Sequence, residues 1–288
     1  MDVLRPRSLD DALAIKAERP EALPVCGGTD VLVGINFDRL RPTALLDIAR
    51  LQELAQVERD DGVVTVGAGV SYTRIMQELP RLTALAQASR TIGSPQIRNR
   101  GTVGGNLGTA SPAGDALPVL AVYEADVLVA DEAGRRAVPW HGFIVDVKRT
   151  TLQPTELIVG VRFRVPRGPG SFSKIGTRNA MVISIAGLCL QIDEDRRAVR
   201  IALGSVAPTI VRATDAERFA AERMERAGLW DDPSATLDDL DGFAELVGEV
   251  ARPIDDVRGT AAYRRHACRV LARRSLAWAL ADRREAAR

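Results

Sequence analysis

Residues 91–115 read TIGSPQIRNRGTVGGNLGTASPAGD, a stretch of small and polar residues with few large apolar ones. Because it has so little to bury, we expect this stretch to lie outside the hydrophobic core. It is then either a mobile linker or a backbone held close to a ligand that needs many small hydrogen-bond donors. Its adjacent glycines bear on this choice, because glycine lets the backbone adopt positive φ and approach a ligand closely.

A second glycine pair supports the ligand interpretation. Residues 26–30 (CGGTD) and 101–106 (GTVGGN) share adjacent glycines, a threonine hydroxyl and a nearby polar residue. Successive N–H groups in such turns can point into one concavity that suits a phosphate or pyrophosphate, especially at a helix N-terminus. A single Gly-Gly turn is more often structural, but the two together favour a phosphate-bearing ligand.

The familiar nucleotide motifs are missing. A P-loop requires Gly-Lys-Ser/Thr, and no Gly-Lys pair occurs in the chain. Gly67-Ala68-Gly69 follows an expected strand, but Tyr72 stands where the dinucleotide fingerprint requires glycine. The sequence therefore disfavours both a P-loop and a Rossmann domain.

Composition and residue spacing limit which partners, metal sites and cellular compartment we expect. The net charge of +1 argues against nucleic acid as a partner. The three cysteines are scattered, and neither histidine has a second ligand at metal spacing, so we expect no metal site, iron–sulfur cluster or disulfide framework in this chain. The N-terminus lacks a signal-peptide pattern and the longest nearly apolar run, 180–190, is too short to span a bilayer, so we expect a cytoplasmic protein without a membrane span.

Apolar periodicity and turn residues predict an α+β protein. Residues 23–35 should form a strand, a Gly-Gly turn and a helix capped by Thr29 or Asp30, with Val31, Leu32 and Ile35 buried. Other helices are expected at 12–17, 72–79, 82–89, 116–123, 213–227, 237–250 and 260–284. Strands are expected at 44–48 and 155–166, in hairpins that turn at 61–62 and 133–134, and at 172–178, 181–192 and 198–206. A Pro/Gly-rich boundary at 166–170 and a weaker division near 55 predict domains at 1–55, 56–167 and 168–288.

Three segments, VCGGTDVLV, IRNRGTVGGNLGTASPAGDALP and PIDDVRGTAAYRRHACRVLARRSL, resemble the FAD-binding subunit of molybdenum hydroxylases such as aerobic carbon monoxide dehydrogenase and xanthine dehydrogenase. The resemblance covers essentially the whole chain. It implies an FAD-binding fold of the vanillyl-alcohol-oxidase and para-cresol-methylhydroxylase type, with two α/β subdomains that hold non-covalent FAD and a C-terminal domain of antiparallel sheet and helices. A departure is Cys26, where alanine is usual.

The resemblance also implies which residues hold the cofactor. The first pyrophosphate loop would be Val25, Cys26, Gly27, Gly28, Thr29, Asp30 and Val31, and the second would be Thr102, Gly104, Gly105 and Asn106. Ile92, Ile158 and Lys174 would lie near the flavin, and Asp115 would bond a polar part of the cofactor. From the residues alone, Asp115 is equally well explained as a helix N-cap, and Lys174 as a solvated lysine on a strand.

In enzymes of this class, a large molybdenum-pterin subunit oxidises the substrate and a small subunit with [2Fe–2S] clusters passes the electrons to FAD. The resemblance therefore implies an electron-transfer role for this chain, which supplies no catalytic residue of its own. The complex would be a dimer of heterotrimers that reduces NAD, a quinone, oxygen or another acceptor. The alternatives are a stand-alone flavin oxidase or reductase of the same fold, and a non-catalytic nucleotide-binding module.

Overall fold

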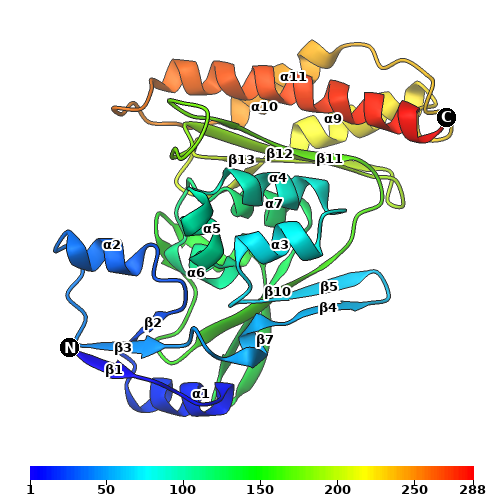
Figure 1. Cartoon of the computed structure of the whole chain (residues 1–288). Helices are drawn as coiled ribbons and strands as arrows, with labels where there is room; N and C mark the ends of the chain where they lie inside the picture. The colour runs from blue at the N-terminus through cyan, green and yellow to red at the C-terminus, as the bar shows by residue number, and fades with distance from the viewer. The chain divides into compact units, whose positions relative to one another are not determined.

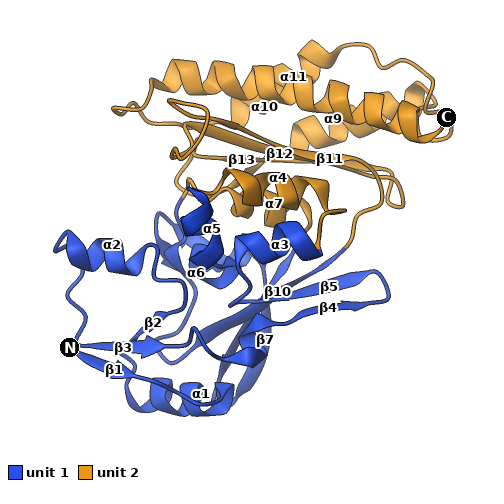
Figure 2. Ribbon diagram, viewed as in Figure 1, with its two compact units in different colours: residues 1–78, 93–111, 124–164 blue, residues 79–92, 112–123, 165–288 orange.

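The computed structural model describes all 288 residues, which pack into two compact units (Figure 2). Unit 1 contains residues 1–78, 93–111 and 124–164. Unit 2 contains residues 79–92, 112–123 and 165–288. Each unit therefore draws on separate parts of the chain, and two short internal segments belong with the C-terminal part.

Unit 1 contains two main sheets (Figure 1). The first is parallel, in the order β1-β3-β2, and the second is antiparallel, in the order β4-β5-β10-β6-β7. A two-stranded ribbon, β8-β9, adds to them. The strands are β1 Asp2–Leu4, β2 Leu23–Val25, β3 Ala44–Asp47, β4 Val57–Asp60, β5 Val63–Gly67, β6 Asp126–Asp131, β7 Gly134–Pro139, β8 Ile144–Asp146, β9 Arg149–Thr150 and β10 Leu157–Arg164.

The helices of unit 1 are mostly short. The longest, α1, begins at the N-cap Ser8, whose hydroxyl accepts from the backbone N–H of Asp11. Its apolar face packs with β3 and the ends of β6 and β10 in one core cluster. The unit contains α1 Leu9–Glu18, α2 Val31–Asn36, α3 Tyr72–Glu78, α5 Pro95–Arg100, α6 Val103–Thr109, α8 Trp140–Phe143 and the 3₁₀ helix η1 Gln52–Ala55.

Unit 2 is a layered structure around one antiparallel sheet, in the order β11-β12-β13-β14. Helices α4 and α7 cover one face of this sheet, and α9, α10 and α11 cover the other (Figure 1). Strand β12 is buried along its whole length because helices pack on both faces. The elements are α4 Thr83–Thr91, α7 Ala116–Val122, β11 Gly170–Ile175, β12 Ala186–Asp193, β13 Ala198–Gly204, β14 Val211–Arg212, α9 Thr214–Arg226, α10 Leu240–Val250 and α11 Ala261–Ala286.

The structure confirms the predicted α+β class and every predicted helix and hairpin, with shifts of a few residues at the ends. The expectation that residues 91–115 lie outside the core is wrong. This stretch forms α5 and α6, and Val103, Gly104 and Leu107 are buried. A Cβ at Gly104 would lie 2.6 Å from the Cβ of Ala68, so the absence of a side chain is what allows the helix to pack.

The expected buried face of α2 is also wrong. No residue of this helix is buried, and Leu32 and Val33 are exposed. Figure 1 shows α2 set away from the sheet β1-β3-β2 of the same unit. The apolar spacing was correctly assigned to a helix, but no neighbouring element of unit 1 covers it.

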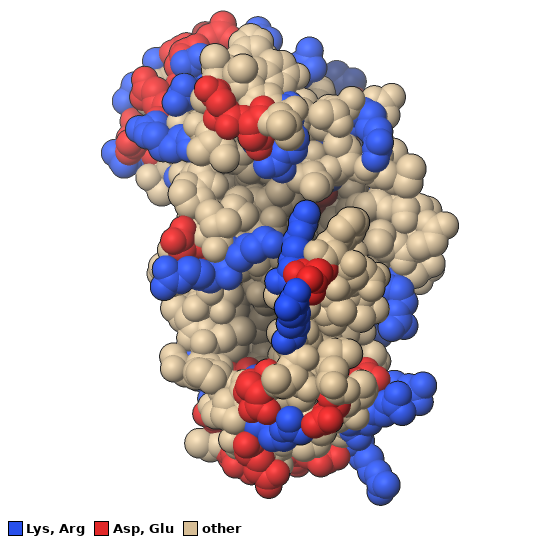
Figure 3. All heavy atoms as spheres, turned by 90° about the vertical axis from the view of Figure 1, so that its left-hand side faces the viewer, with Lys and Arg blue, Asp and Glu red and all other residues tan.

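Basic and acidic side chains are interspersed on the face that Figure 3 shows, in keeping with the net charge of +1. None of the helices combines the length and the apolar character needed to cross a membrane.

Candidate cofactor site

The two glycine loops lie in direct backbone contact in unit 1. A Cβ at Gly27 would lie 2.0 Å from the carbonyl oxygen of Arg100, so only glycine fits there. The Cys26 thiol forms a hydrogen bond with Thr102, although burial raises the pKa of this thiol. At the far end of α6, the Thr109 hydroxyl lies 3.3 Å from the carboxylate of Asp30. The structure therefore brings together two loops that are about 75 residues apart in sequence.

The first loop offers unused hydrogen-bond donors. It follows the carboxyl end of β2 and enters α2 with Gly28 at φ = 73°. The first backbone N–H after this turn that donates to the protein is that of Leu32, to the carbonyl of Gly28 at 3.0 Å. The consecutive N–H groups from Gly27 to Val31 have no protein acceptor. A row of such donors at a turn with positive φ suits an anionic oxygen-rich group.

The second loop uses its donors internally. The N–H of Gly104 donates to Ala68 at 2.9 Å, and that of Gly105 donates to the Thr102 hydroxyl at 3.0 Å. The N–H of Asn106 donates to the Thr102 carbonyl at 3.0 Å. This loop caps α6 and supports the first loop, and the Oδ1 of Asn106 is its buried polar atom without a protein partner.

A cavity of about 340 Å³ adjoins the first loop. It lies at the carboxyl ends of the parallel strands β2 and β3, where ligands of parallel sheets commonly bind. Arg50 and Arg100 bring positive charge to it, and neither forms an ion pair with a carboxylate. Its lining is Val3, Val25, Cys26, Gly27, Gly28, Leu32, Leu45, Asp47, Ala49, Arg50 and Arg100. The composition of the lining and the free N–H groups fit a diphosphate-bearing ligand.

A buried ion pair occupies the other part of the predicted site, in unit 2. The Lys174 ammonium lies 2.5 Å from Oδ2 of Asp115, and the two side chains are 8% and 4% exposed. Lys174 also donates to the carbonyl of Thr91 at 3.1 Å, and the Thr91 hydroxyl lies 3.0 Å from Asp115. Burial raises the pKa of Asp115 to about 6, against the opposing effects of Lys174 and Thr91.

This ion pair argues against the two explanations that the residues alone offered, a helix N-cap for Asp115 and a solvated strand position for Lys174. Asp115 stands at the N-terminus of α7, but its side chain makes no capping hydrogen bond. Lys174 is buried and not solvated. Ile92 ends α4 directly after Thr91, so it adjoins the pair in unit 2. Ile158 lies on β10 in unit 1, where a Cβ at Gly108 of α6 would be 3.7 Å from its Cδ1.

Sequence reasoning missed Arg50, Arg100 and Asp47 at the cavity and Thr91 at the ion pair. Arg100 and Thr91 lie inside residues 91–115, the stretch of small and polar residues, so their position there was an available signal. Nothing local marks Arg50 or Asp47, because their role depends on the parallel sheet that places them beside the first loop.

A row of free backbone donors beside a cavity with two arginines is the arrangement expected of a protein with a diphosphate-containing cofactor. Two family models together match most of the chain: the FAD-binding domain of molybdopterin dehydrogenases over residues 1–167, and the C-terminal domain of the CO dehydrogenase flavoprotein over residues 171–279. The chain belongs to this family of FAD-binding oxidoreductase subunits, which confirms the resemblance.

Relatives and solved structures agree with this assignment. The chain is 30% identical to the alpha subunit of the 6-hydroxypseudooxynicotine dehydrogenase complex of Paenarthrobacter nicotinovorans, over 95% of this chain and 92% of that protein. It is 29% identical to the carbon monoxide dehydrogenase medium chain of Hydrogenophaga pseudoflava, over 95% and 96% of the two chains. A chain of the solved structure of carbon monoxide dehydrogenase from that organism, in a form that lacks the Mo-pyranopterin moiety, superposes with a TM-score of 0.84 at 26% identity, over 98% of each chain.

Proposed function

We propose that this chain is the electron-transfer subunit of a cytoplasmic molybdenum hydroxylase. A small [2Fe–2S] subunit delivers electrons to its non-covalently bound FAD, and an external acceptor removes them. The substrate is oxidised at a large molybdenum-pterin subunit, and the complex is a dimer of heterotrimers. Bound FAD supplies the redox chemistry, so the chain itself needs no acid, base or nucleophile.

The observation that carries this proposal is the unused row of N–H donors from Gly27 to Val31. We assign these donors, with the flanking Val25 and Cys26, to the FAD pyrophosphate. Hydrogen bonds to a charged group contribute about 1.5–3 kcal/mol each, so several of them hold a dinucleotide firmly. Family membership identifies the cofactor as FAD, and the free N–H donors of the first loop support the proposal that the pyrophosphate binds there.

The other proposed contacts follow from the same arrangement. Thr102 and Gly104 act by shaping and supporting the first loop, and Gly105 leaves open space for the cofactor to approach. The buried Oδ1 of Asn106, which has no protein partner, can accept a hydrogen bond from the cofactor. In unit 2, we assign Ile92, Asp115 and Lys174 to the flavin end, and in unit 1 we assign Ile158 to the same end. The domain division at 55 and 167 remains part of the proposal.

The proposal is tested by purifying the chain and precipitating it with acid. It should be yellow, and the colour should move into the supernatant as FAD, because no histidine or cysteine lies in the second loop to attach it. Flavin that stays in the pellet would contradict non-covalent binding. A colourless protein that takes up no added FAD would favour the nucleotide-binding module instead.

A further inference from the structure

Arg100 is held beside the first glycine loop by its main chain. Its carbonyl oxygen lies so close to Gly27 that a Cβ there would be 2.0 Å away. The next residue is fixed as well, because the N–H of Tyr72 donates to the carbonyl of Gly101 at 3.1 Å. These contacts involve backbone atoms of Arg100 and Gly101, so the Arg100 side chain is not needed for the packing of the two loops.

The side chain of Arg100 lines the cavity and has no protein partner. It is exposed, forms no ion pair with a carboxylate, and donates no hydrogen bond to the protein. Arg98, two residues earlier, is used differently, because its Nη1 donates to the carbonyl of Gly93 at 3.0 Å. A guanidinium presents its donors in a planar fork that matches the oxygens of a phosphate group. Arg100 therefore offers a cation with unused donors at the edge of the cavity.

The charge of Arg100 acts on the first loop. Burial raises the pKa of the Cys26 thiol, and the positive charge of Arg100 opposes this rise. Arg50, the other arginine in the lining, has no such effect on Cys26. Of the two arginines, Arg100 is thus the one whose charge is felt where the row of free N–H groups begins.

The cavity needs a cation because carboxylates are close to it. Asp47 lines the cavity at the carboxyl end of β3, and burial and the charge of Asp47 both raise the pKa of Cys26. Asp30 lies at the end of the donor row, before α2. A diphosphate linkage is a dianion, and these carboxylates repel it, whereas the N–H groups attract it only as dipoles.

We propose that Arg100 is the ionic contact for the pyrophosphate of the cofactor, and that its charge offsets the repulsion from Asp47 and Asp30. This inference rests on the proposed function and adds to it a residue that the family resemblance does not assign. Arg100 acts in binding and positioning the cofactor and takes no part in the redox step.

The test measures FAD binding to the cofactor-free chain at low and at physiological salt. Arg100→Met removes the charge and keeps an unbranched stem, and it should raise the dissociation constant for FAD at least about tenfold at low salt. The affinity of this variant should also depend less on salt, because screening weakens contacts between charges. Arg100→Lys keeps the charge without the fork, so it should retain the salt dependence at an intermediate affinity.

The matched control is Arg135→Met. Arg135 lies on β7, is exposed, forms no ion pair and is not part of the cavity lining, so this variant should leave FAD affinity and its salt dependence unchanged. Thermal unfolding of the cofactor-free proteins should give the same stability for all variants. Unchanged FAD affinity in Arg100→Met would overturn the proposal. A loss of affinity with unaltered salt dependence would also overturn it, because it would assign Arg100 a structural role.

Alkylation of Cys26 reports whether the cofactor occupies this cavity. Cys26 lines the cavity, and the other two cysteines are buried, so a thiol reagent should label Cys26 alone in the folded chain. FAD should protect Cys26 from labelling, and Arg100→Met should require a higher FAD concentration for the same protection. A chain that binds FAD but is labelled equally with and without it overturns the assignment of Arg100. A chain that binds no FAD contradicts the proposed function itself, and this inference with it, which is a distinct outcome.

Discussion

At the scale of single residues, Gly104 and Gly105 are neighbours with different reasons to be glycine. A Cβ at Gly104 would lie 2.6 Å from the Ala68 side chain and 2.8 Å from its carbonyl oxygen. A Cβ at Gly105 would meet only the Thr102 hydroxyl, at 3.2 Å. The first glycine therefore serves packing, and the second faces open space where a cofactor can approach.

We expect Gly104→Ala to lower the free energy of unfolding by about 1–3 kcal/mol, because backbone atoms have to move. Gly105→Ala should leave thermal stability within about 0.5 kcal/mol of the unaltered chain. If the cofactor passes Gly105, this variant should still lose FAD affinity. Thermal unfolding of the FAD-free proteins, beside FAD titration by fluorescence, separates the two effects. Equal stability loss in both variants would contradict this division of roles.

We expect substitutions of Lys174 and of Asp115 to shift the flavin reduction potential in opposite directions. A cation near the flavin stabilises its reduced anionic form, and Asp115 offsets that cation. Lys174→Met should lower the two-electron flavin potential by tens of millivolts, and Asp115→Asn should raise it, since about 30 mV corresponds to 1.4 kcal/mol for two electrons. The double variant should lie near the unaltered protein. A redox titration at full FAD occupancy decides this, and shifts of the same sign would remove both residues from the flavin end.

The same pair carries a pH dependence. Burial raises the pKa of Asp115 from 3.8 to about 6, so the folded chain binds this proton more tightly than the unfolded chain does. This contribution to stability is complete below pH 3.8 and is lost as pH rises through 6. Lys174→Met removes an interaction that lowers the pKa of Asp115, so the window should extend above pH 6. Unfolding free energies of both proteins between pH 5 and 8 measure the change, and superimposable profiles would argue against it.

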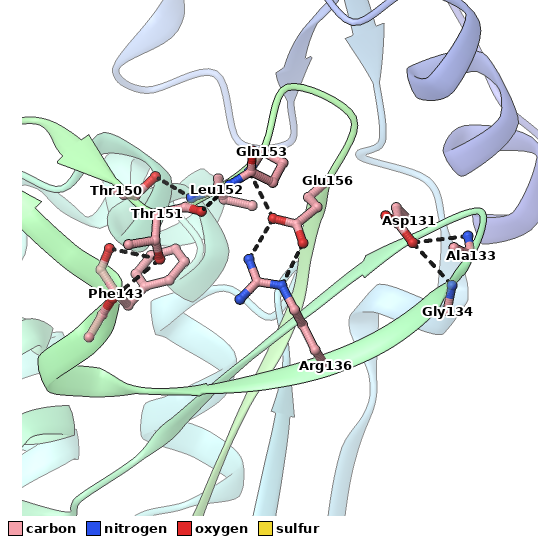
Figure 4. Close-up of polar contacts among 11 residues, drawn as sticks. Asp131, Ala133, Gly134, Arg136, Phe143, Thr150, Thr151, Leu152, Gln153 and Glu156 are labelled. Carbon is pink, nitrogen blue, oxygen red and sulfur yellow. Dashed lines mark hydrogen bonds and ion pairs between the residues drawn. The ribbon is translucent and has the colours of Figure 1, made fainter.

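At the scale of elements, an ion pair links the hairpin β6–β7 to the turn before β10 (Figure 4). Arg136 on β7 donates to both oxygens of Glu156, at 2.6 and 2.7 Å, and the N–H of Gln153 donates to the same carboxylate at 2.8 Å. The Glu156 side chain is 6% exposed, whereas Arg136 is 44% exposed. The carboxylate therefore fixes the turn before β10 to the edge of the sheet.

Glu156→Gln should lower the free energy of unfolding by about 1–2 kcal/mol, reduced by the solvent around Arg136. Arg136 lowers the pKa of Glu156 below its usual 4.5, so this stabilisation is complete above pH 4.5 and is lost as pH falls through the lowered pKa. The difference between the two proteins should shrink from pH 7 to pH 3. Asp146→Asn, in an exposed pair at 3.8 Å, is the control and should change little. A difference that does not depend on pH would assign the loss to packing.

Elements were also where sequence reasoning was most successful. The apolar periodicity and the turn residues located the hairpins at 61–62 and 133–134, because the local geometry of the turn determines where a hairpin forms. Burial was harder to predict. Gly104 is buried through its contact with Ala68, and α2 is exposed because no element covers it. Neither property can be read from the local sequence pattern. The sequence singled out both glycine loops, and their assignment to the cofactor stays a prediction. Which loop keeps free donors and which supports the other depends on contacts with Ala68 and Val70.

At the scale of the whole chain, the order of elements conceals how they pack. Residues 79–92 and 112–123 join residues 165–288 in unit 2, because α4 and α7 cover a sheet formed much later in the sequence. The Lys174 pair follows from this arrangement, since Thr91 and Asp115 come from those two segments. Family resemblance alone assigns Lys174 to the flavin and Asp115 to a polar part of the cofactor, and it does not point to Thr91.

The placement of the cysteines yields the last prediction. Cys189 and Cys268 are fully buried, and burial raises the pKa of both thiols, to about 12 for Cys268. Thiols that resist deprotonation in this way are poor iron ligands. We therefore expect the isolated chain to contain FAD but no iron, and to reduce no dye at the expense of an organic substrate. When co-expressed with its partner subunits, it should elute in a complex that contains molybdenum and iron in fixed ratio to FAD, and that reduces the dye. Metal analysis and a dye assay on both samples are the measurements. Substrate-dependent dye reduction by the isolated chain would instead establish a stand-alone flavin oxidoreductase.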